Sequence, residues 1–161
     1  MKQIRIGTLI FALLLPLLVG ALSAALSSNG MAAYGEMQKP PLSPPAWLFP
    51  VAWTILYIMM GLSSYLIFVA DIEFSHKFML VVLYLIQLCL NFMWSILFFR
   101  WDAYMPAFIC LMVLWCVVIL CAFRFYSTSR LATLLLIPYI IWLTFAAYLN
   151  LGAYILRARG K

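Results

Sequence analysis

The chain has 161 residues, of which 68% are hydrophobic and only 9% are charged, and its formal net charge is +6. A soluble domain has about 25% charged residues, and a domain of this size leaves roughly a third of its chain surface in water. A soluble fold would therefore expose a large apolar surface. The composition excludes that class and predicts an integral membrane protein.

Charged residues divide the chain into five long apolar intervals. A spanning helix needs about 20 apolar residues to cross a hydrocarbon core of roughly 30 Å. Each interval holds one such helix, and runs such as LIFALLLPLLVGALSAAL lack the alternation of barrel strands. We therefore predict an all-α integral membrane protein, a five-transmembrane-helix bundle that forms a single domain over 1–161. The predicted helices cover residues 6–26, 47–69, 78–99, 104–124 and 131–156.

The first segment allows two interpretations. Lys2 and Arg5 precede its apolar stretch, and Ala-Leu-Ser-Ala stands near its end. A cleavable secretory signal peptide has the same features. We interpret this segment as the first spanning helix and keep the signal peptide as the alternative.

The positive charges of the loops do not define the orientation. Five spans place five Lys and Arg residues on each side of the membrane, whereas the positive-inside rule needs an excess on one side. Nucleic-acid binding needs a clustered basic face, and the positive charges here are spread over both sides. The net charge therefore indicates contact with anionic headgroups. We expect membrane lipid, and no nucleic acid, among the partners.

Few side chains in the predicted spans are suited to chemistry. No Asp, Glu, Lys, Arg or His lies clearly inside a span, which argues against a proton-coupled transporter, a charge-lined channel or a pump. The sole histidine, His76, falls in a loop, and the cysteines lack the spacing of a zinc site. We expect no metal and no conventional catalytic residues. The cysteines, which we interpret as small hydrophobic residues, are Cys89, Cys110, Cys116 and Cys121.

Aromatic residues make up 17% of the chain. Trp and Tyr favour both membrane interfaces, and such a belt accounts for Trp47 and Trp101 at predicted helix ends. Trp53, Trp94 and Trp142 lie inside predicted spans, where a belt does not account for them.

Helical spacing places some of these rings beside polar groups. Asn91 and Trp94 share one face of the 78–99 helix, and Trp53 and Tyr57 share one face of the 47–69 helix. An unpaired amide in lipid costs several kcal/mol, so Asn91 should point inward. Periodicity alone leaves two interpretations open, a packed core held by polar contacts or a ligand pocket.

Three segments carry a resemblance: KPPLSPPAWLFPVAWTILYIMMG from Lys39, LCLNFMWSILFF from Leu88 and PYIIWLTFAAYLN from Pro138. In order and spacing they resemble the translocator protein family, which includes the bacterial tryptophan-rich sensory proteins (TspO) and the mitochondrial peripheral-type benzodiazepine receptor. The resemblance implies a five-helix bundle whose Pro-rich first loop, residues 34–46, forms a lid over a cavity. Proline fixes φ and disfavours helix, which fits a stiff lid.

The resemblance also implies a function. It predicts a membrane receptor or sensor, a homodimer, that binds porphyrin or haem-type tetrapyrroles, sterols and other flat apolar ligands without a required cofactor. The expected location is a bacterial cell membrane. The ligand-binding residues it implies are Gly20, Ser23, Tyr34, Trp47, Phe49, Trp53, Asn91, Trp94, Trp142 and Ala146. We add Tyr57, which shares a helix face with Trp53.

Two other activities stay open. One is light- and oxygen-dependent breakdown of a bound porphyrin, with Trp53 and Trp142 as redox partners. The other is passive transport of tetrapyrroles or sterols. The sequence departs from the family at Cys110, where an aspartate is common, and at Pro106, where a tryptophan is common; their effect on the pocket also stays open.

The segment from Leu151 to Arg157 formally satisfies a proposed sterol motif, which is a weak pattern. We interpret Tyr154 and Arg157 first as an interface anchor.

Overall fold

The computed structural model describes residues 4–27 and 39–159. Within them the chain forms five helices and no strand, and all five helices are long and apolar enough to cross a membrane. The predicted all-α five-span bundle is confirmed, and the protein is a multi-pass integral membrane protein. The helices are α1 (Ile6–Leu26), α3 (Leu48–Phe68), α4 (Phe74–Phe99), α5 (Tyr104–Tyr126) and α6 (Arg130–Arg159).

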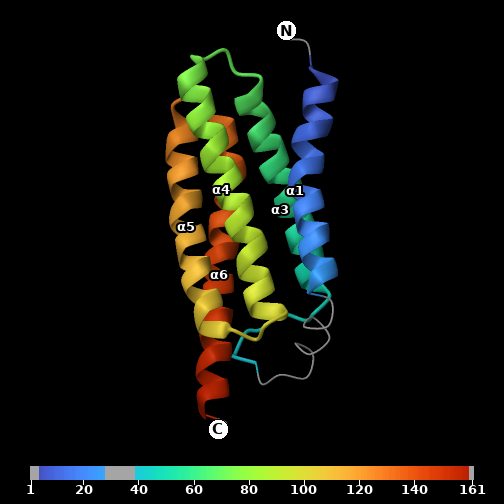
Figure 1. Ribbon diagram of the computed structural model, residues 1–161, viewed down its shortest axis with the longest axis vertical. Coiled ribbons are helices and arrows are strands. Elements are labelled where there is room, and N and C mark those ends of the chain that lie inside the picture. Colours follow the sequence, from blue (N-terminus) through green and yellow to red (C-terminus); the bar gives the residue numbers. More distant parts are fainter. Residues whose placement is uncertain (1–3, 28–38, 160–161) are drawn as a thin grey trace.

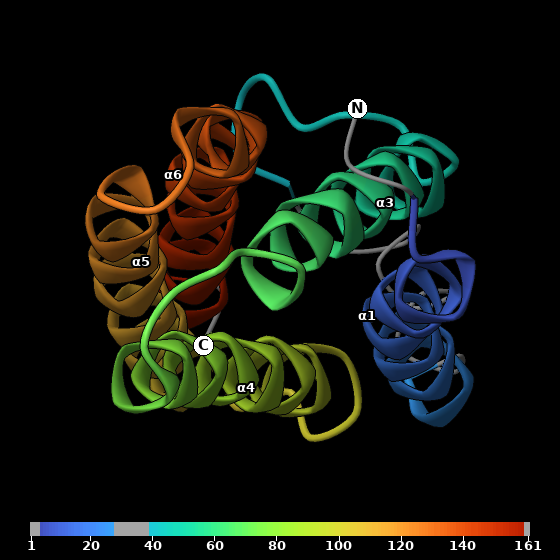
Figure 2. The ribbon, with the colours of Figure 1, turned by 90° about the horizontal axis from the view of Figure 1, so that it is seen from above.

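Each helix runs antiparallel to the next one along the chain (Figure 1). Seen from the end, the order around the bundle is α1, α3, α6, α5 and α4, with α4 in contact with α1 (Figure 2). This order brings α3 and α6, which are far apart in the sequence, into direct contact. The inner faces of α3, α4 and α6 therefore surround a common interior.

Three helices, α4, α5 and α6, are longer than the sequence predicts, and α4 and α6 differ most. The α4 helix begins at Phe74 rather than at residue 78, and α6 ends at Arg159 rather than at residue 156. The prediction followed the apolar spans, whereas a helix continues into the headgroup region until a turn or a proline stops it. The α6 helix also continues through Pro138, which spanning helices tolerate.

The α1 and α3 backbones approach closely at Gly61. A Cβ atom at Gly61 would lie 2.8 Å from the carbonyl oxygen of Ala12 and 2.9 Å from the Cα of Leu13. Small residues permit such contacts between spanning helices. Gly61 thus sets the distance between α1 and α3.

The described part of the Pro-rich loop, residues 39–46, lies against the second half of α6. The Pro40 ring packs on Gly152, where a Cβ atom would lie 2.6 Å from the Pro40 Cβ. The Tyr148 hydroxyl donates a hydrogen bond to the Pro41 carbonyl oxygen at 2.8 Å. Leu42 adopts a φ of 65°, a left-handed conformation that is uncommon outside glycine. The loop is therefore fixed to α6 just before α3 begins.

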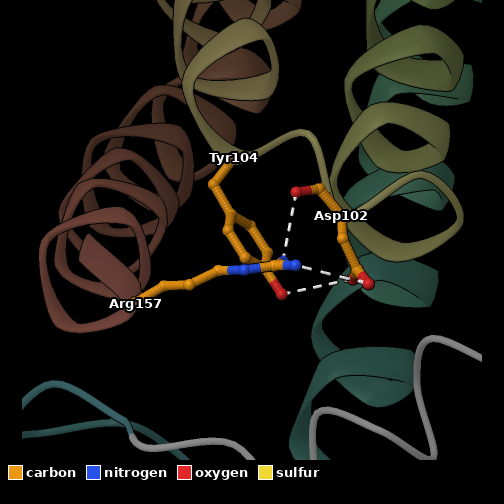
Figure 3. A network of polar contacts seen from close by, with 3 residues as sticks. All are labelled: Asp102, Tyr104 and Arg157. Carbon is orange, nitrogen blue, oxygen red and sulfur yellow. Dashed lines mark hydrogen bonds and ion pairs between the residues drawn. The ribbon is translucent and has the colours of Figure 1, made fainter. Parts of the chain in front are cut away.

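The last turns of α6 extend past the ends of the other helices (Figure 1). Arg157, on these turns, contacts Asp102 and Tyr104 (Figure 3). Its guanidinium donates to the Asp102 carbonyl oxygen at 3.3 Å and lies 3.9 Å from the Asp102 carboxylate. It also lies 5.0 Å from the centre of the Tyr104 ring, and the Tyr104 hydroxyl donates to Asp102 Oδ1 at 3.2 Å. This network, the Arg157 clasp, ties α6 to the connection between α4 and α5.

Candidate functional site

Trp53 lies at the centre of a cluster of rings from three helices, which we call the Trp53 cluster. Its ring centroid is 5.6 Å from that of Tyr57 on the same helix and 5.7 Å from that of Trp94 on α4. Two α6 residues, Tyr139 and Trp142, have centroids at 6.1 Å and 6.4 Å from it. Such tilted and edge-on contacts are favourable for aromatic rings. The three tryptophans that a belt does not account for are therefore neighbours.

A chain of hydrogen bonds runs beside these rings. The Tyr57 hydroxyl donates to Asn91 Oδ1 at 2.9 Å, and Asn91 Nδ2 donates to the Tyr139 hydroxyl. That hydroxyl donates in turn to Gln87 Oε1 at 3.2 Å. All four side chains are buried, and Asn91 is only 1% exposed. The chain joins α3 to α6 through α4 and satisfies groups that would be costly in lipid without partners.

Three N–H groups at this site are buried without a hydrogen-bond partner among the described residues: Trp94 Nε1, Trp142 Nε1 and Gln87 Nε2. Leaving a buried donor unpaired costs about 1–3 kcal/mol. A native structure retains such a group where another molecule or a change of conformation can satisfy it. The Trp53 cluster therefore combines contact area with unused donors.

Two further predicted residues lie next to the cluster. The Phe49 ring is buried, with its centroid 6.2 Å from that of Trp142, and Ala146 is buried on α6.

The two predicted small residues of α1, Gly20 and Ser23, are both buried. A Cβ atom at Gly20 would collide with the Tyr57 ring, so Gly20 makes room for that ring. Ser23 is buried, and its hydroxyl has no partner among the described residues.

Two other predicted residues are Trp47 and Tyr34. Trp47 is 66% exposed and stands at the N-cap of α3. Tyr34 lies outside the described residues. The membrane-interface position that the sequence suggests for Trp47 accounts for its exposure.

Tyr139 and Gln87 are the site residues that the sequence reasoning missed. Tyr139 stands three positions before Trp142, and Gln87 four positions before Asn91, so both follow the spacing of one helix face. The same periodicity that selected Trp142 and Asn91 could have found them.

An apolar hollow of about 460 Å³ lies between α3 and α6, within the usual range for ligand sites. The sequence reasoning expects a hollow among the rings themselves. In the structure these rings contact one another, and this open volume lies beside them. Trp142 belongs both to the cluster and to the hollow. The hollow is lined by Ala52, Ile55, Leu56, Met59, Pro138, Ile141, Trp142 and Phe145.

Cys110 and Pro106, the two α5 residues that differ from the family pattern, make contacts elsewhere. The Cys110 thiol donates to the Leu90 carbonyl oxygen at 3.7 Å, which links α5 to α4. Pro106 lines a separate hollow of about 510 Å³ beside Asp102 and Arg157. Within residues 4–27 and 39–159, no group of three or more His, Cys, Asp or Glu side chains could hold a metal ion.

The fold and the site define a class: a five-span membrane protein whose α3, α4 and α6 helices enclose an aromatic and amide cluster. The sequence profile of the TspO/MBR family matches residues 12–156. The chain therefore belongs to the TspO/MBR family, as its motifs predict.

Individual relatives agree. Over 117 residues, 73% of this chain and 74% of the relative, the sequence is 39% identical to the "Tryptophan-rich protein TspO" of Chlorobaculum tepidum. It is 37% identical over 139 residues to the "Translocator protein" of Bos taurus, covering 85% of this chain and 82% of that protein. It is 33% identical over 132 residues, 82% of each chain, to "Protein CrtK" of Rhodobacter capsulatus.

Proposed function

We propose that the protein is an intramembrane receptor that binds porphyrin-type tetrapyrroles and other flat apolar ligands at the Trp53 cluster. The observation that carries the proposal is the pair of buried indole N–H groups of Trp94 and Trp142, which have no partner in the described part of the chain and whose rings both contact Trp53. A flat aromatic ligand offers area for stacking, and its carbonyl or carboxylate groups offer acceptors for these donors. Asn91, held between Tyr57 and Tyr139, contributes a fixed polar group that orients the ligand.

Binding at this cluster requires a movement of rings. A flat ligand that contacts a ring on each face needs ring planes about 7 Å apart, twice the carbon contact distance of about 3.5 Å. The Trp53 and Trp94 centroids are 5.7 Å apart. We therefore expect the ligand to displace at least one indole. Asn91 keeps its position because hydrogen bonds hold it on both sides.

The hollow between α3 and α6 supports entry of the ligand from the bilayer. Apolar ligands concentrate in lipid, and the hollow faces lipid because its residues Ile55 and Ile141 are exposed. Trp142 separates this hollow from Trp53, so rotation of the Trp142 ring would connect the two. Pro138 stands one turn earlier and removes one backbone hydrogen bond from α6, which makes local adjustment easier.

The Pro-rich loop acts as the lid in this proposal. Its described part is anchored on α6 by Tyr148 and Gly152, close to the start of α3. Prolines reduce the conformational freedom that a lid loses when it closes on a ligand. Tyr34 is the lid residue that we expect to contact the ligand.

Protoporphyrin titration tests the proposal. Quenching of tryptophan fluorescence should report binding, and Trp53→Phe, Asn91→Ala and Trp142→Phe should each weaken it about three- to tenfold, the worth of a ring contact or a hydrogen bond. Trp101→Phe is the matched control, because Trp101 is exposed at the α4–α5 connection. Unchanged affinity in all three cluster variants would exclude this site.

Breakdown of the bound ligand is the second candidate function. The contact of Trp53 with four other rings favours it, since neighbouring indoles and phenols can share an electron vacancy produced by an excited tetrapyrrole. Illumination in air separates the two functions. Bleaching of protoporphyrin no faster than in empty detergent micelles would leave binding alone.

The family resemblance supports a homodimer in a bacterial cell membrane. Analytical ultracentrifugation in detergent tests the dimer, and a monomer at micromolar concentration would contradict it.

A further inference from the structure

A third hollow, of about 870 Å³, lies where the chain enters α1 and passes from α3 to α4. Figure 1 shows this end of the bundle, which holds the N-terminus, opposite the Pro-rich loop. It is bounded by the residues just before α1, the last turn of α3 and the first turn of α4. Part of its wall is apolar and includes Leu66, Val69 and Ala70. Its charged residues are Arg5, Lys77 and Asp71.

This hollow lies at the level of lipid headgroups. The α1 span begins at Ile6, the α3 span ends at Phe68 and the α4 span begins at Phe74. Spanning helices of this length leave the hydrocarbon core at about these residues. The apolar wall therefore faces the start of the acyl chains, and the charged residues face the headgroup layer.

The two cations of the hollow have donors to spare. Arg5 donates its backbone N–H to the Tyr65 hydroxyl at 3.3 Å, and its guanidinium has no partner among the described residues. Within the described part of the chain, Lys77 donates one hydrogen bond, to the Phe68 carbonyl oxygen at 3.2 Å. An ammonium has three donors and a guanidinium five, so most of them are unused.

We propose that this hollow binds the headgroup of a bilayer phospholipid. The phosphate lies between Arg5 and Lys77, and the first carbons of the acyl chains lie along Leu66, Val69 and Ala70. Phosphate oxygens accept strong charge-assisted hydrogen bonds from these two side chains. Basic pockets between spanning helices are suited to lipid headgroups for the same reason. The carboxylate of Asp71, which has no hydrogen bond or ion pair with the described residues, selects a headgroup that also carries an ammonium, such as phosphatidylethanolamine.

Native mass spectrometry of the protein released from detergent micelles measures this binding. Titration with phosphatidylethanolamine should give a saturable adduct of one lipid, and Arg5→Gln should weaken it about tenfold, the worth of one hydrogen bond to a charged group. The Arg5 guanidinium has no hydrogen bond or ion pair within the described residues, so this variant should fold normally. Arg124→Gln is the matched control: it removes one exposed cation at the same end of the bundle, outside the hollow, and should bind like the wild type.

Three further arms make the test specific. Ala70→Phe fills part of the hollow without changing its charge and should also reduce the amount of bound lipid. Inorganic phosphate at millimolar concentration should not displace the lipid, because it cannot use the apolar wall. Asp71→Asn should remove the preference for phosphatidylethanolamine over phosphatidylglycerol.

Four results would contradict the proposed lipid site or the role of Asp71. Wild-type affinity in Arg5→Gln or Ala70→Phe, or equal losses in Arg5→Gln and Arg124→Gln, would overturn the site. Displacement by inorganic phosphate would show an anion site rather than a lipid site and would overturn it as well. A wild type that prefers phosphatidylglycerol would overturn the role of Asp71.

Discussion

The α3–α6 contact has two halves that differ in how their polar groups are paired. At the end that holds the N-terminus, the Ser63 hydroxyl donates to the Ala132 carbonyl oxygen at 2.8 Å, and Leu136 beside it on α6 is almost fully buried. Toward the other end, Trp53 and Trp142 are only partly buried, and the indole N–H of Trp142 has no partner among the described residues. Among the described residues, the same two helices thus form one half in which the Ser63 hydroxyl is hydrogen-bonded and one half in which the Trp142 indole donor is not.

This difference separates stability from binding. Saturated hydrogen bonds and close packing leave nothing for a ligand to improve. Unpaired donors lower the stability of the ligand-free protein. The same donors, and rings with accessible edges, can bind a ligand. We therefore expect substitutions in the first half to change the free energy of unfolding, and substitutions in the second half to change ligand affinity.

Leu136→Ala should produce the largest loss of stability. Truncating a buried leucine leaves a cavity that costs about 2–5 kcal/mol. Equilibrium unfolding in a denaturing detergent should show this loss, while protoporphyrin affinity stays within twofold of the wild type. A loss of affinity as large as that in Trp142→Phe would break the division between the halves.

Gly61→Ala and Gly20→Ala form a pair that sharpens the comparison. The new methyl group at Gly61 meets backbone atoms of Ala12 and Leu13, which cannot move without shifting α1, so the cost should be about 1–3 kcal/mol. At Gly20 it meets the Tyr57 ring, which can turn but then loses its place beside Asn91. We expect Gly20→Ala to weaken ligand binding more than Gly61→Ala does.

Gly7→Ala is the control for both glycine variants, because nothing lies within 4 Å of a Cβ atom at that position. The free energy of unfolding of Gly7→Ala should be unchanged or slightly higher, because alanine has a better helix propensity than glycine. A destabilised Gly7→Ala would mean that the other two losses come from the helix itself rather than from contacts.

Ser63→Ala and Trp142→Phe compare a paired donor with an unpaired one. Removing the Ser63 hydroxyl deprives the Ala132 carbonyl oxygen of this donor and should cost about 1 kcal/mol. Trp142→Phe removes a donor that has no partner among the described residues, which offsets part of the lost ring area. Thermal unfolding followed by circular dichroism should rank Trp142→Phe as the more stable variant; the reverse order would contradict the comparison.

Leu42→Asn should have the smallest effect. The left-handed conformation of Leu42 costs roughly 1 kcal/mol more for a bulky residue than for asparagine. Leu42 is exposed, so little packing is lost, and a small gain in stability is expected in the same unfolding assay. A loss would mean that the Leu42 side chain has a contact of its own in the membrane.

The elements of the fold were predictable from the sequence because charge and hydropathy mark the spans directly. Lipid excludes unpaired backbone groups, so an apolar interval of about 20 residues has few alternatives to a helix. The ends of α4 and α6 were less predictable, since no change in hydropathy marks where a helix stops in the headgroup layer.

The candidate site was predictable in part. Periodicity places Asn91 and Trp94 on one face, but it does not give the rotation of one helix relative to another, which depends on contacts such as that of Gly61 with α1. For this reason the sequence could not show that Gly20 serves the Tyr57 ring or that Trp47 lies apart from Trp53. Nor could it show that the open volume lies on the lipid side of Trp142, because ring-to-ring contact depends on side-chain conformation.

The extension of α6 beyond its neighbours links two connections that are distant in sequence. Pro40 rests on Gly152, and the turn before α5 is tied to Arg157, so both depend on less than two turns of one helix. A chain that ends at Asn150 would keep every residue of the Trp53 cluster and the hydrogen bond from Tyr148 to Pro41. It would lose the Pro40–Gly152 contact and the Arg157 clasp in a single step. Unwinding the C-terminal turns of α6 would therefore weaken the attachment of the Pro-rich loop and free the turn before α5, without removing a residue of the Trp53 cluster.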